Sequence, residues 1–596
     1  MKSFYEAGLL RDLDVHLIES LIRTFLARGN PPSEEIKTLL ALAVRVTNEG
    51  HVCLDLHTDR WWQLDRIRRE DEEQTSAREK QIALLPSPPD AQRALLNCPE
   101  WVGSGKSNLP FILERNRLYL RRFWNYEKRV ANKLRAFAEQ KPTPIPARLR
   151  IQLATITFGR EGQFRPTPSQ LDAVQQGLKN QLTIITGGPG TGKTTIAALL
   201  LRLLVAQAGN TAPLRVRMAA PTGKAAARLQ ESVGSEISTH TSQILWEPAS
   251  TLERLLGYQR NSPYFRHNHE TPLLADIVLI DETSMIDLPK MAKLLDAITP
   301  LTRLILLGDK NQLASVDPGS VMAELCEATA LRHCIVELTE SKRFDADSAV
   351  TPISQAVRAG DADSAWKLVA DPSIGTANKK VTLHDATAFT PRDVPKDFAE
   401  IVRARYQPFL AAKTPAEVFR ALSAFRVLCT LRRGATGSNR INAFIENLLF
   451  PNRKGDFYDH RVILVTKNDY DVHLFNGDVG ILLPNEEGDL VAHFETREQP
   501  LPTRLLPAHE SAFAMTVHKA QGSGFDHIAL ILPTQESPIL TRELIYTGLT
   551  RTETGVDLWC EPSTFKSGVT RPTARSMGLR EQLDTPASTP KPNPAT

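Results

Sequence analysis

A glycine-rich loop between an apolar run and a helical stretch constrains the fold of this chain most. The loop reads Gly187-Gly-Pro-Gly-Thr-Gly192-Lys193-Thr194; the apolar run Leu182–Thr186 precedes it and the helical stretch Ile196–Leu204 follows. It matches the pattern G-x-x-x-x-G-K-[ST], which is specific when a strand enters it and a helix leaves it. A glycine-rich surface turn is the plain alternative, and the flanking segments make it improbable. We therefore predict a strand–loop–helix unit of an α/β sheet.

This loop has the chemistry of a phosphate cradle. Glycines let backbone N–H groups wrap around phosphate oxygens, and a helix N-terminus adds a favourable dipole. A lysine at this place neutralises the β and γ oxygens, and the hydroxyl that follows it can bind Mg²⁺. We therefore predict that ATP is held by Gly187, Gly188, Pro189, Gly190, Thr191, Gly192, Lys193, Thr194 and Thr195.

Two adjacent carboxylates complete the predicted ATP site. Asp281 and Glu282 directly follow the apolar run Ile277–Ile280, and the carboxyl ends of parallel strands are where nucleotides bind in such sheets. Asp281, together with Thr194, is predicted to hold Mg²⁺, and Glu282 to polarise the water that attacks the γ-phosphate. Alone, such a pair is usually a solvated strand end. Together with the phosphate loop, it indicates an ATP-hydrolysing site.

The rest of the chain divides into several parts, as its 596 residues require. Residues 1–145 have helical spacing and end at the proline-rich joint 141–146. Two series of short apolar runs alternate with helical stretches, which is typical of parallel sheets. The predicted strands of the two series are 182–186, 216–220, 277–280 and 304–307, then 427–430, 513–515, 528–532 and 556–560.

Two further segments stand apart from these series. The segment 462–496 has turn signals between β-like runs and suggests a small inserted β barrel. The tail 566–596 is rich in Thr, Pro, Ser and Ala, so we expect its end to be disordered.

Composition narrows the class of protein without deciding the function. The net charge of +4 is too small to indicate a nucleic-acid surface by itself. The six cysteines form no C-x-x-C pair, which argues against a zinc site or a disulfide framework. No run of about 18 apolar residues occurs, so we expect a cytoplasmic protein with no membrane contact.

Beyond the loop, the chain carries an ordered series of motifs that resembles superfamily 1 DNA helicases. In order they are Ala220–Lys224, Asp281–Glu282, Gly308–Leu313, Glu340–Phe344, Met515–Gly522 and Tyr546–Arg551. The resemblance implies that Gln170 contacts adenine, that Gln312 senses the γ-phosphate, and that Arg343 and Arg551 stabilise the transferring phosphoryl group. It also implies contacts with single-stranded DNA by Pro221, Thr222, Lys224, Thr516, His518 and Lys519.

The resemblance is narrower than the superfamily. The stretches Thr251–Gly257, Ile280–Pro289, Phe475–Asp478 and Thr516–Gly522 look like the RecD family, the alpha subunits of exodeoxyribonuclease V. Three N-terminal stretches, at 13–15, 50–54 and 117–127, resemble the members that work in complexes. The chain departs from the family at Glu253, where histidine is usual, and at Gly524, where an acidic residue is usual.

This resemblance implies an α/β fold with two RecA-like motor domains. The expected parts are a helical partner-binding domain (1–145), a first motor domain (146–345) with a hairpin near 259–270, and a second motor domain (346–596). The second domain would carry an SH3-like barrel near 452–510 and a flexible tail.

The implied activity is that of an ATP-dependent 5′–3′ DNA helicase subunit that uses Mg²⁺. It would act with RecB and RecC in double-strand break repair, recombination and degradation of linear DNA, and the nuclease site would lie in the beta subunit. A stand-alone RecD-like helicase and a non-motor ATP-binding scaffold are the alternatives.

Overall fold

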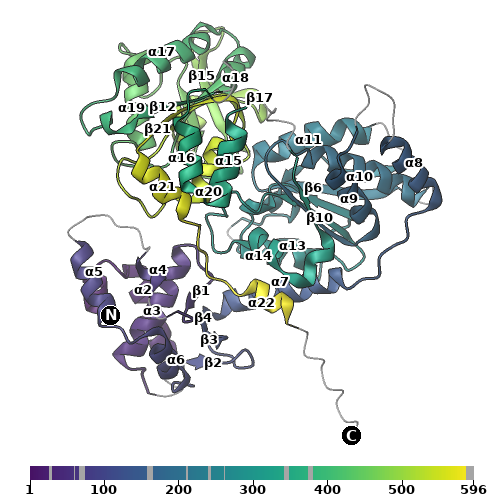
Figure 1. The fold of residues 1–596 in the computed structure, drawn as a ribbon, viewed down its shortest axis with the longest axis vertical. Coiled ribbons are helices and arrows are strands. Elements are labelled where there is room, and N and C mark those ends of the chain that lie inside the picture. The colour runs from purple at the N-terminus through teal and green to yellow at the C-terminus, as the bar shows by residue number, and fades with distance from the viewer. Residues whose placement is uncertain are drawn as a thin grey trace.

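The computed structural model describes residues 1–25, 30–58, 61–65, 74–157, 165–209, 213–238, 243–260, 262–340, 348–373 and 380–585. These residues form an N-terminal body and two larger bodies, each built on a parallel sheet (Figure 1). The two parallel sheets confirm the predicted α/β class. No helix within the described ranges is long and apolar enough to cross a membrane.

The N-terminal body is mostly helical. Its helices are α1 (Lys2–Glu6), α2 (Asp12–Phe25), α3 (Glu34–Asn48), α4 (Trp62–Asp65), α5 (Gln74–Ala83), α6 (Pro88–Leu96) and α7 (Arg121–Ala138). Serine side chains cap α3 and α6, where Ser33 and Ser87 accept hydrogen bonds from backbone N–H groups of the first turn. The sequence pattern missed a small sheet of order β1-β4-β3-β2, formed by β1 (Cys53–Asp55), β2 (Val102–Gly103), β3 (Phe111–Glu114) and β4 (Arg117–Leu120). Strands of two to four residues leave too little periodicity to be recognised.

The first parallel sheet has the order β11-β5-β10-β9-β6-β7, with β8 paired to β6. Its strands are β5 (Leu182–Gly187), β6 (Leu214–Ala220), β7 (Ile244–Trp246), β8 (Ser250–Thr251), β9 (Ile277–Ile280), β10 (Arg303–Gly308) and β11 (Ile335–Leu338). Successive side chains enter different cores: Ile184 joins the core shared with the N-terminal body, and Ile185 joins the core on the opposite face. Burial on both faces explains why these strands are continuously apolar.

Helices cover both faces of this sheet. They are α8 (Ala147–Thr157), α9 (Pro168–Lys179), α10 (Lys193–Ala208), α11 (Gly223–Ser238), α12 (Leu252–Leu255), α13 (Leu288–Ala297) and α14 (Val321–Glu327), with short 3₁₀ turns at Thr283–Met285 and Thr329–Cys334. Helices α9 and α10 supply the core on one face, and α13 and α14 supply the core on the other, which also receives α7.

The second parallel sheet has the order β12-β21-β20-β13-β19. Its strands are β12 (Val381–Asp385), β13 (Phe425–Cys429), β19 (Ala514–Thr516), β20 (Phe525–Ile531) and β21 (Thr552–Cys560). Its helices are α15 (Val350–Ala359), α16 (Ala362–Ala370), α17 (Lys396–Ala411), α18 (Pro415–Ala424), α19 (Ser438–Leu449), α20 (Arg542–Leu549) and α21 (Pro562–Thr570), with a 3₁₀ turn at Ala386–Ala388. The edge strand β12 was not predicted, because only the first of its five residues is buried.

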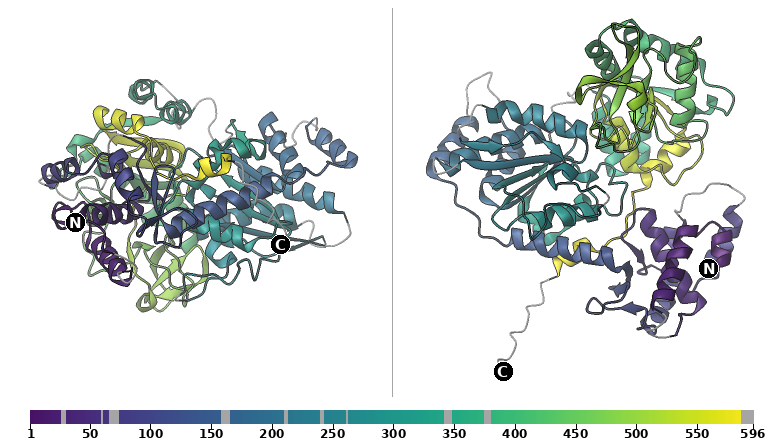
Figure 2. Two further views of the ribbon diagram at one scale, coloured as in Figure 1. Left: turned by 90° about the horizontal axis from the view of Figure 1, so that it is seen from below. Right: turned by 180° about the vertical axis from the view of Figure 1, so that it is seen from behind.

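An antiparallel sheet is inserted between β13 and β19. Its order is β17-β16-β15-β14-β18, with β14 (Val462–Val465), β15 (Val479–Pro484), β16 (Leu490–Phe494), β17 (Arg497–Pro502) and β18 (His509–Ser511), and a 3₁₀ turn at Thr503–Leu505. We call it the inserted sheet. It has a small core of its own, which includes Ile463, Leu482 and Phe494. Figure 2 shows its light-green strands on the side of the second body that faces the first.

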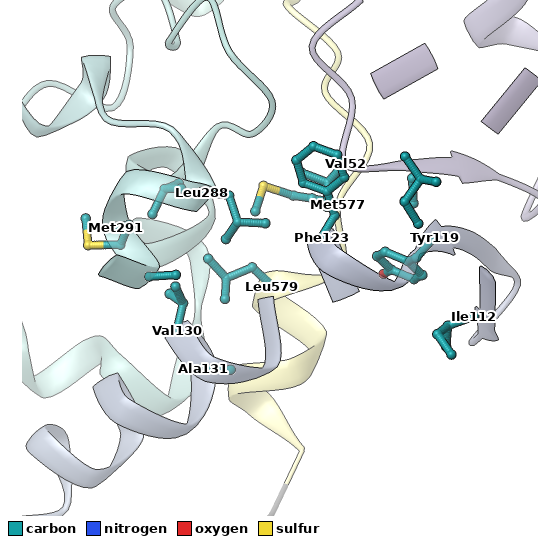
Figure 3. Packing of buried hydrophobic residues seen from close by; sticks show 14 of the residues in the cluster. Val52, Ile112, Tyr119, Phe123, Val130, Ala131, Leu288, Met291, Met577 and Leu579 are labelled. Atoms are coloured by element: carbon teal, nitrogen blue, oxygen red, sulfur yellow. The ribbon is translucent and has the colours of Figure 1, made fainter. Parts of the chain in front are cut away.

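The end of the chain returns to the other two bodies. Residues 571–585, which we call the C-terminal strap, leave the second body, run beside the N-terminal body and form α22 (Leu579–Asp584) against α7 (Figure 1). Met577 and Leu579 are buried between α7 and α13 (Figure 3). Arg117 forms a bidentate ion pair with Glu581, at 2.7 Å for each contact. Residues 566–585 are thus ordered, whereas the end of the tail, where disorder is expected, lies at 586–596, outside the described residues.

Candidate active site

The glycine-rich loop joins β5 to α10, as predicted. Gly190 and Gly192 have φ values of +75° and +82°, which favour glycine. Lys193 is the first residue of α10, and its Nζ donates to the carbonyl oxygens of Gly187 at 2.7 Å and Gly188 at 3.1 Å. The backbone N–H groups in the first turn of α10, which includes Thr194, have no partner inside the helix. The loop is thus a strand-to-helix cradle with a cation at its centre.

Gln170 lies underneath this loop. It forms a capping box at the start of α9, where its Oε1 accepts from the Thr167 N–H at 3.0 Å. Its Nε2 donates to the Thr191 carbonyl at 2.9 Å, and the residue is only 1% exposed. Both ends of the amide are therefore bound to the protein. In this conformation Gln170 supports the loop, and its contact with an adenine edge stays a prediction.

The two predicted carboxylates lie at the carboxyl end of β9. Burial and the charge of Glu282 raise the pKa of Asp281, and the charge of Lys193 opposes this shift. The structure thus brings Asp281 and Lys193 close together, as the sequence predicted. Glu282 has a φ of +49°, in the left-handed region that side chains other than glycine rarely adopt, and its N–H donates to Asp281 Oδ1 at 2.8 Å. Such strain costs about 1–3 kcal/mol and is common where a side chain must be aimed.

A buried carboxylate after β10 connects the two parallel-sheet bodies. Asp309 is inaccessible to solvent, and its Oδ2 accepts from Gln312 Nε2 at 3.3 Å and from the Tyr546 hydroxyl at 3.0 Å. Tyr546 belongs to α20 of the second body. Its hydroxyl also lies against the loop, because a Cβ on Gly188 would be 2.9 Å away from it. One tyrosine oxygen therefore touches the loop and the Gln312 segment together.

Two more hydrogen bonds cross this interface next to Gln312. The Leu313 N–H donates to Thr547 Oγ1 at 3.0 Å, and Gln521 Nε2 donates to the Leu313 carbonyl at 3.0 Å. All of these groups are buried. The segment after β10 is thus hydrogen-bonded to two separate motifs of the second body, Met515–Gly522 and Tyr546–Arg551.

Of the two predicted arginine fingers, the described residues include Arg551 but not Arg343. Arg551 is 4% exposed; its Nε donates to the Thr547 carbonyl at 3.0 Å and its Nη1 to the Ser523 carbonyl at 3.1 Å. Its guanidinium is therefore hydrogen-bonded within the second body, beside the residues that contact Leu313. Arg343 lies outside the described residues.

Thr222, one of the residues predicted to contact DNA, lies at a second crossing between the bodies. Thr222 caps α11, accepting from the Ala225 N–H at 3.2 Å, and a Cβ on Gly522 would lie 3.5 Å from its hydroxyl. Arg228 Nη1 donates to the Gly522 carbonyl at 2.7 Å. Pro221, Lys224, Thr516, His518 and Lys519 are all partly exposed.

Both lysines of this set have carboxylate partners in the inserted sheet. Lys224 Nζ is 3.7 Å from Glu495 Oε2, and Lys519 Nζ is 2.8 Å from Glu510 Oε1. Sequence reasoning did not find these partners, nor the roles of Asp309, Tyr546 and Arg228. Tyr546 lies within the motif Tyr546–Arg551, so the sequence did mark it as a candidate. Glu495 lies in no motif, because its place beside Lys224 depends on how the inserted sheet docks.

The segment predicted as a hairpin has one antiparallel bridge, Tyr258 to Phe265. Tyr258 stacks on Tyr470 of the inserted sheet's loop, with ring centroids 3.9 Å apart and an interplanar angle of 8°. Glu253, the departure from the family pattern, is 3.4 Å from Lys290. It therefore has a partner in its own body.

Comparison with known proteins places these features in one family. Family models match for the AAA domain at residues 165–375, for the N-terminal domain of RecBCD enzyme subunit RecD at 6–119, and for the UvrD-like helicase C-terminal domain at 511–558. The RecBCD enzyme subunit RecD of Mycolicibacterium smegmatis is 35% identical, covering 97% of this chain and 98% of that protein. The same subunit of Haemophilus influenzae is 31% identical, covering 93% and 94%.

A third relative matches only part of the chain. The ATP-dependent RecD2 DNA helicase of Deinococcus radiodurans is 30% identical, but the match covers 73% of this chain and only 54% of that protein. The match to the RecD subunits is full-length and includes their N-terminal domain. The chain belongs to the RecD family of helicases, in the branch of the RecBCD enzyme subunits.

Proposed function

We propose that this chain is the ATP-driven 5′–3′ DNA motor of a RecBCD-type helicase and nuclease. One observation carries the proposal: the phosphate loop, the buried Asp309 and the second parallel-sheet body meet at the Tyr546 hydroxyl. A change at the loop therefore has a direct mechanical route to the body that carries Thr516, His518 and Lys519. In the complex, this activity would serve double-strand break repair, recombination and degradation of linear DNA.

The residues at the loop fit ATP and Mg²⁺. Gly190 and Gly192 have backbone angles that turn N–H groups inward, and Lys193 holds two carbonyl oxygens that phosphate oxygens would replace. Thr194 and Asp281 would hold Mg²⁺, which usually binds one or two protein oxygens and keeps several waters. When bound, the ion neutralises charge on the β and γ phosphates.

The hydrolytic roles follow from the placement of each group. Glu282, held by its left-handed backbone, would orient and deprotonate the attacking water. Gln312 would respond to the γ-phosphate from its place on Asp309. Arg551 would exchange its carbonyl partners for phosphate oxygens when the bodies close, with Arg343 as the second cation; such fingers accelerate phosphoryl transfer by roughly 10³ to 10⁵.

Translocation would use alternating grips on one strand. Hydroxyl and cationic groups such as Thr222 and Lys224 of the first body, and Thr516 and Lys519 of the second, suit phosphate contacts that do not read sequence. Closure on ATP and opening after hydrolysis would change the distance between the two grips. The polarity is taken from the family, since these contacts are the same in either direction.

We assign the finer parts of the fold in the same way. The parallel-sheet bodies would be RecA-like motor domains, near 146–345 and 346–570, and the inserted sheet an SH3-like barrel. The N-terminal body would bind partners, with RecB and RecC as the other subunits. It presents exposed apolar side chains, such as Leu13 of α2 (67% exposed), Leu84 just after α5 (74%) and Leu96 of α6 (60%), which suits docking.

A Lys193→Gln variant tests the proposed function. We expect it to abolish ATP hydrolysis stimulated by single-stranded DNA while the chain stays folded, because glutamine keeps a polar end but lacks the charge and is one atom shorter. A fully active variant would exclude the assignment. Unwinding of 5′-tailed but not 3′-tailed duplexes tests polarity.

Co-purification separates the alternatives. Recovery with RecB and RecC supports the subunit, whereas recovery of a lone chain supports an independent helicase. A folded chain that binds ATP but shows no DNA-stimulated hydrolysis with Lys193 intact would indicate a scaffold.

A further inference from the structure

Both lysines proposed to grip DNA are already paired with carboxylates, and both carboxylates come from the inserted sheet. Glu495 lies in the turn between β16 and β17 and reaches Lys224 of the first body at 3.7 Å. Glu510 lies in β18 and reaches Lys519 of the second body at 2.8 Å. The two lysines belong to different bodies, so a single sheet supplies the counter-charge for both.

The surroundings of Lys224 contain more positive than negative charge. Burial lowers its pKa, the charges of Arg228 and Arg426 lower it further, and the charge of Glu495 raises it. Arg426 is 3% exposed; its Nη1 donates to the Ala512 carbonyl, and its Nε has no hydrogen-bond partner. A buried cation with an unpaired N–H is unfavourable unless an anion lies nearby. Glu495 is one such anion, and a DNA phosphate would be another.

The site around Lys519 repeats this arrangement. One oxygen of Glu510 contacts Lys519, and the other contacts Arg432 Nη2 at 2.8 Å. The Arg432 side chain is 62% exposed. One carboxylate therefore neutralises two cations on the surface next to the proposed strand path.

The inserted sheet is also fastened to the first body. Tyr470 stacks on Tyr258, and the Arg254 guanidinium lies 4.8 Å from the centre of the Phe475 ring. The sheet thus stands on the second body, where it is inserted, and contacts the first (Figure 2). These contacts place Glu495 beside Lys224 across the boundary between the bodies.

We propose that Glu495 and Glu510 are built-in competitors of the DNA phosphates, occupying both lysine grips until a strand displaces them. The inference rests on the proposed DNA contacts of Lys224 and Lys519. A carboxylate and a phosphate diester both offer one negative charge spread over two oxygens. Strand binding would therefore exchange one anion for another, which lowers the net affinity and makes the grip easier to release.

The full chain carrying Glu495→Gln and Glu510→Gln tests this proposal. Its equilibrium binding to a fluorescent oligothymidylate is measured by anisotropy at several salt concentrations, without nucleotide. We expect binding to tighten by about threefold to thirtyfold, the range of two partly exposed ion pairs. We also expect the slope of log K against log salt to steepen by up to about 1.4, since each freed lysine adds about 0.7 for single strands.

Glu498→Gln is the matched control. Glu498 is an exposed carboxylate in β17 of the same sheet, so its removal changes the net charge without freeing a lysine grip. We expect its slope to match that of the wild type. Melting curves of all variants check that the glutamine substitutions leave the fold intact.

The double variant Lys224→Ala with Lys519→Ala distinguishes the proposed DNA contacts from the proposed competition by the carboxylates. If these changes leave binding unaltered, the proposed DNA contacts themselves are wrong. If they weaken binding while the glutamine variants bind no more tightly than wild type, the contacts stand and the competition is refuted. Weaker binding by the glutamine variants would mean that Glu495 and Glu510 hold the lysines in position for the strand.

Discussion

Replacing Tyr546 by phenylalanine removes one oxygen atom from the interface between the two parallel-sheet bodies. That oxygen donates to Asp309 Oδ2 at 3.0 Å and lies against Gly188 of the phosphate loop. Asp309 has no solvent exposure, so water cannot replace the lost donor. The remaining contact of this carboxylate oxygen, from Gln312, is longer, at 3.3 Å. The interface would therefore hold a poorly satisfied buried carboxylate.

The size of the effect follows from the kind of bond. A hydrogen bond to a charged group contributes about 1.5–3 kcal/mol, and roughly 1.4 kcal/mol changes an equilibrium constant tenfold. If the bond acts only when the domains are closed, the ratio of closed to open forms falls by about 10-fold to 150-fold. Since hydrolysis requires closure, kcat of the DNA-stimulated ATPase should fall by a similar factor. ATP binding to the chain without DNA should change little.

Tyr406→Phe provides the comparison. The Tyr406 hydroxyl donates to the Phe513 carbonyl at 2.8 Å and the residue is 1% exposed, but both partners lie in the second domain. Its loss should reduce stability by about 1 kcal/mol and leave kcat unchanged. Steady-state ATPase measurements at saturating single-stranded DNA, with melting curves, decide the matter. Equal kcat values for the two variants would refute a coupling role for Tyr546.

Two further predictions concern the C-terminal strap. Leu579 has no exposed surface between α7 and α13. Leu579→Ala should therefore lower the free energy of unfolding of this region by about 2–5 kcal/mol and make the strap sensitive to protease. An unchanged rate of cleavage by protease would contradict this. Burial raises the pKa of Glu127, which accepts from the Gly578 N–H at 2.8 Å, to about 7 from 4.5. The folded state thus keeps a proton that the unfolded state loses, so stability should fall as pH rises from about 4.5 to 7, by up to about 3 kcal/mol, and level off above. In thermal melts from pH 5 to 8, Glu127→Gln should lack this decline.

The sequence predicted those features that depend on local pattern. The strands β5, β9 and β10 were recognised because parallel strands buried on both faces are continuously apolar, and Lys193 was placed because its loop has fixed spacing. The short strands of the N-terminal body and the edge strand β12 have too few buried residues to give such a signal.

Features that depend on how distant segments dock were not predictable. The bond from Gln170 to Thr191 joins two segments whose approach no spacing encodes. The same holds for Glu495 beside Lys224 and for the strap, whose polar composition gave no sign that Met577 and Leu579 are buried. Composition describes a segment alone, whereas burial depends on what packs against it.

The strap also limits how the second parallel-sheet body can move. Thr573 is bound to Glu543 of that domain, with hydroxyl to carboxylate 2.6 Å apart, whereas Arg575 donates to the carbonyls of Glu49 and Ser315 in the other two bodies. A single residue, Ala574, separates these two anchorages. The second body is therefore held to the other two at the point where the chain leaves it. Because one residue links the two anchorages, the second body can turn about this point but cannot move away from it without breaking the bonds of Thr573 or of Arg575.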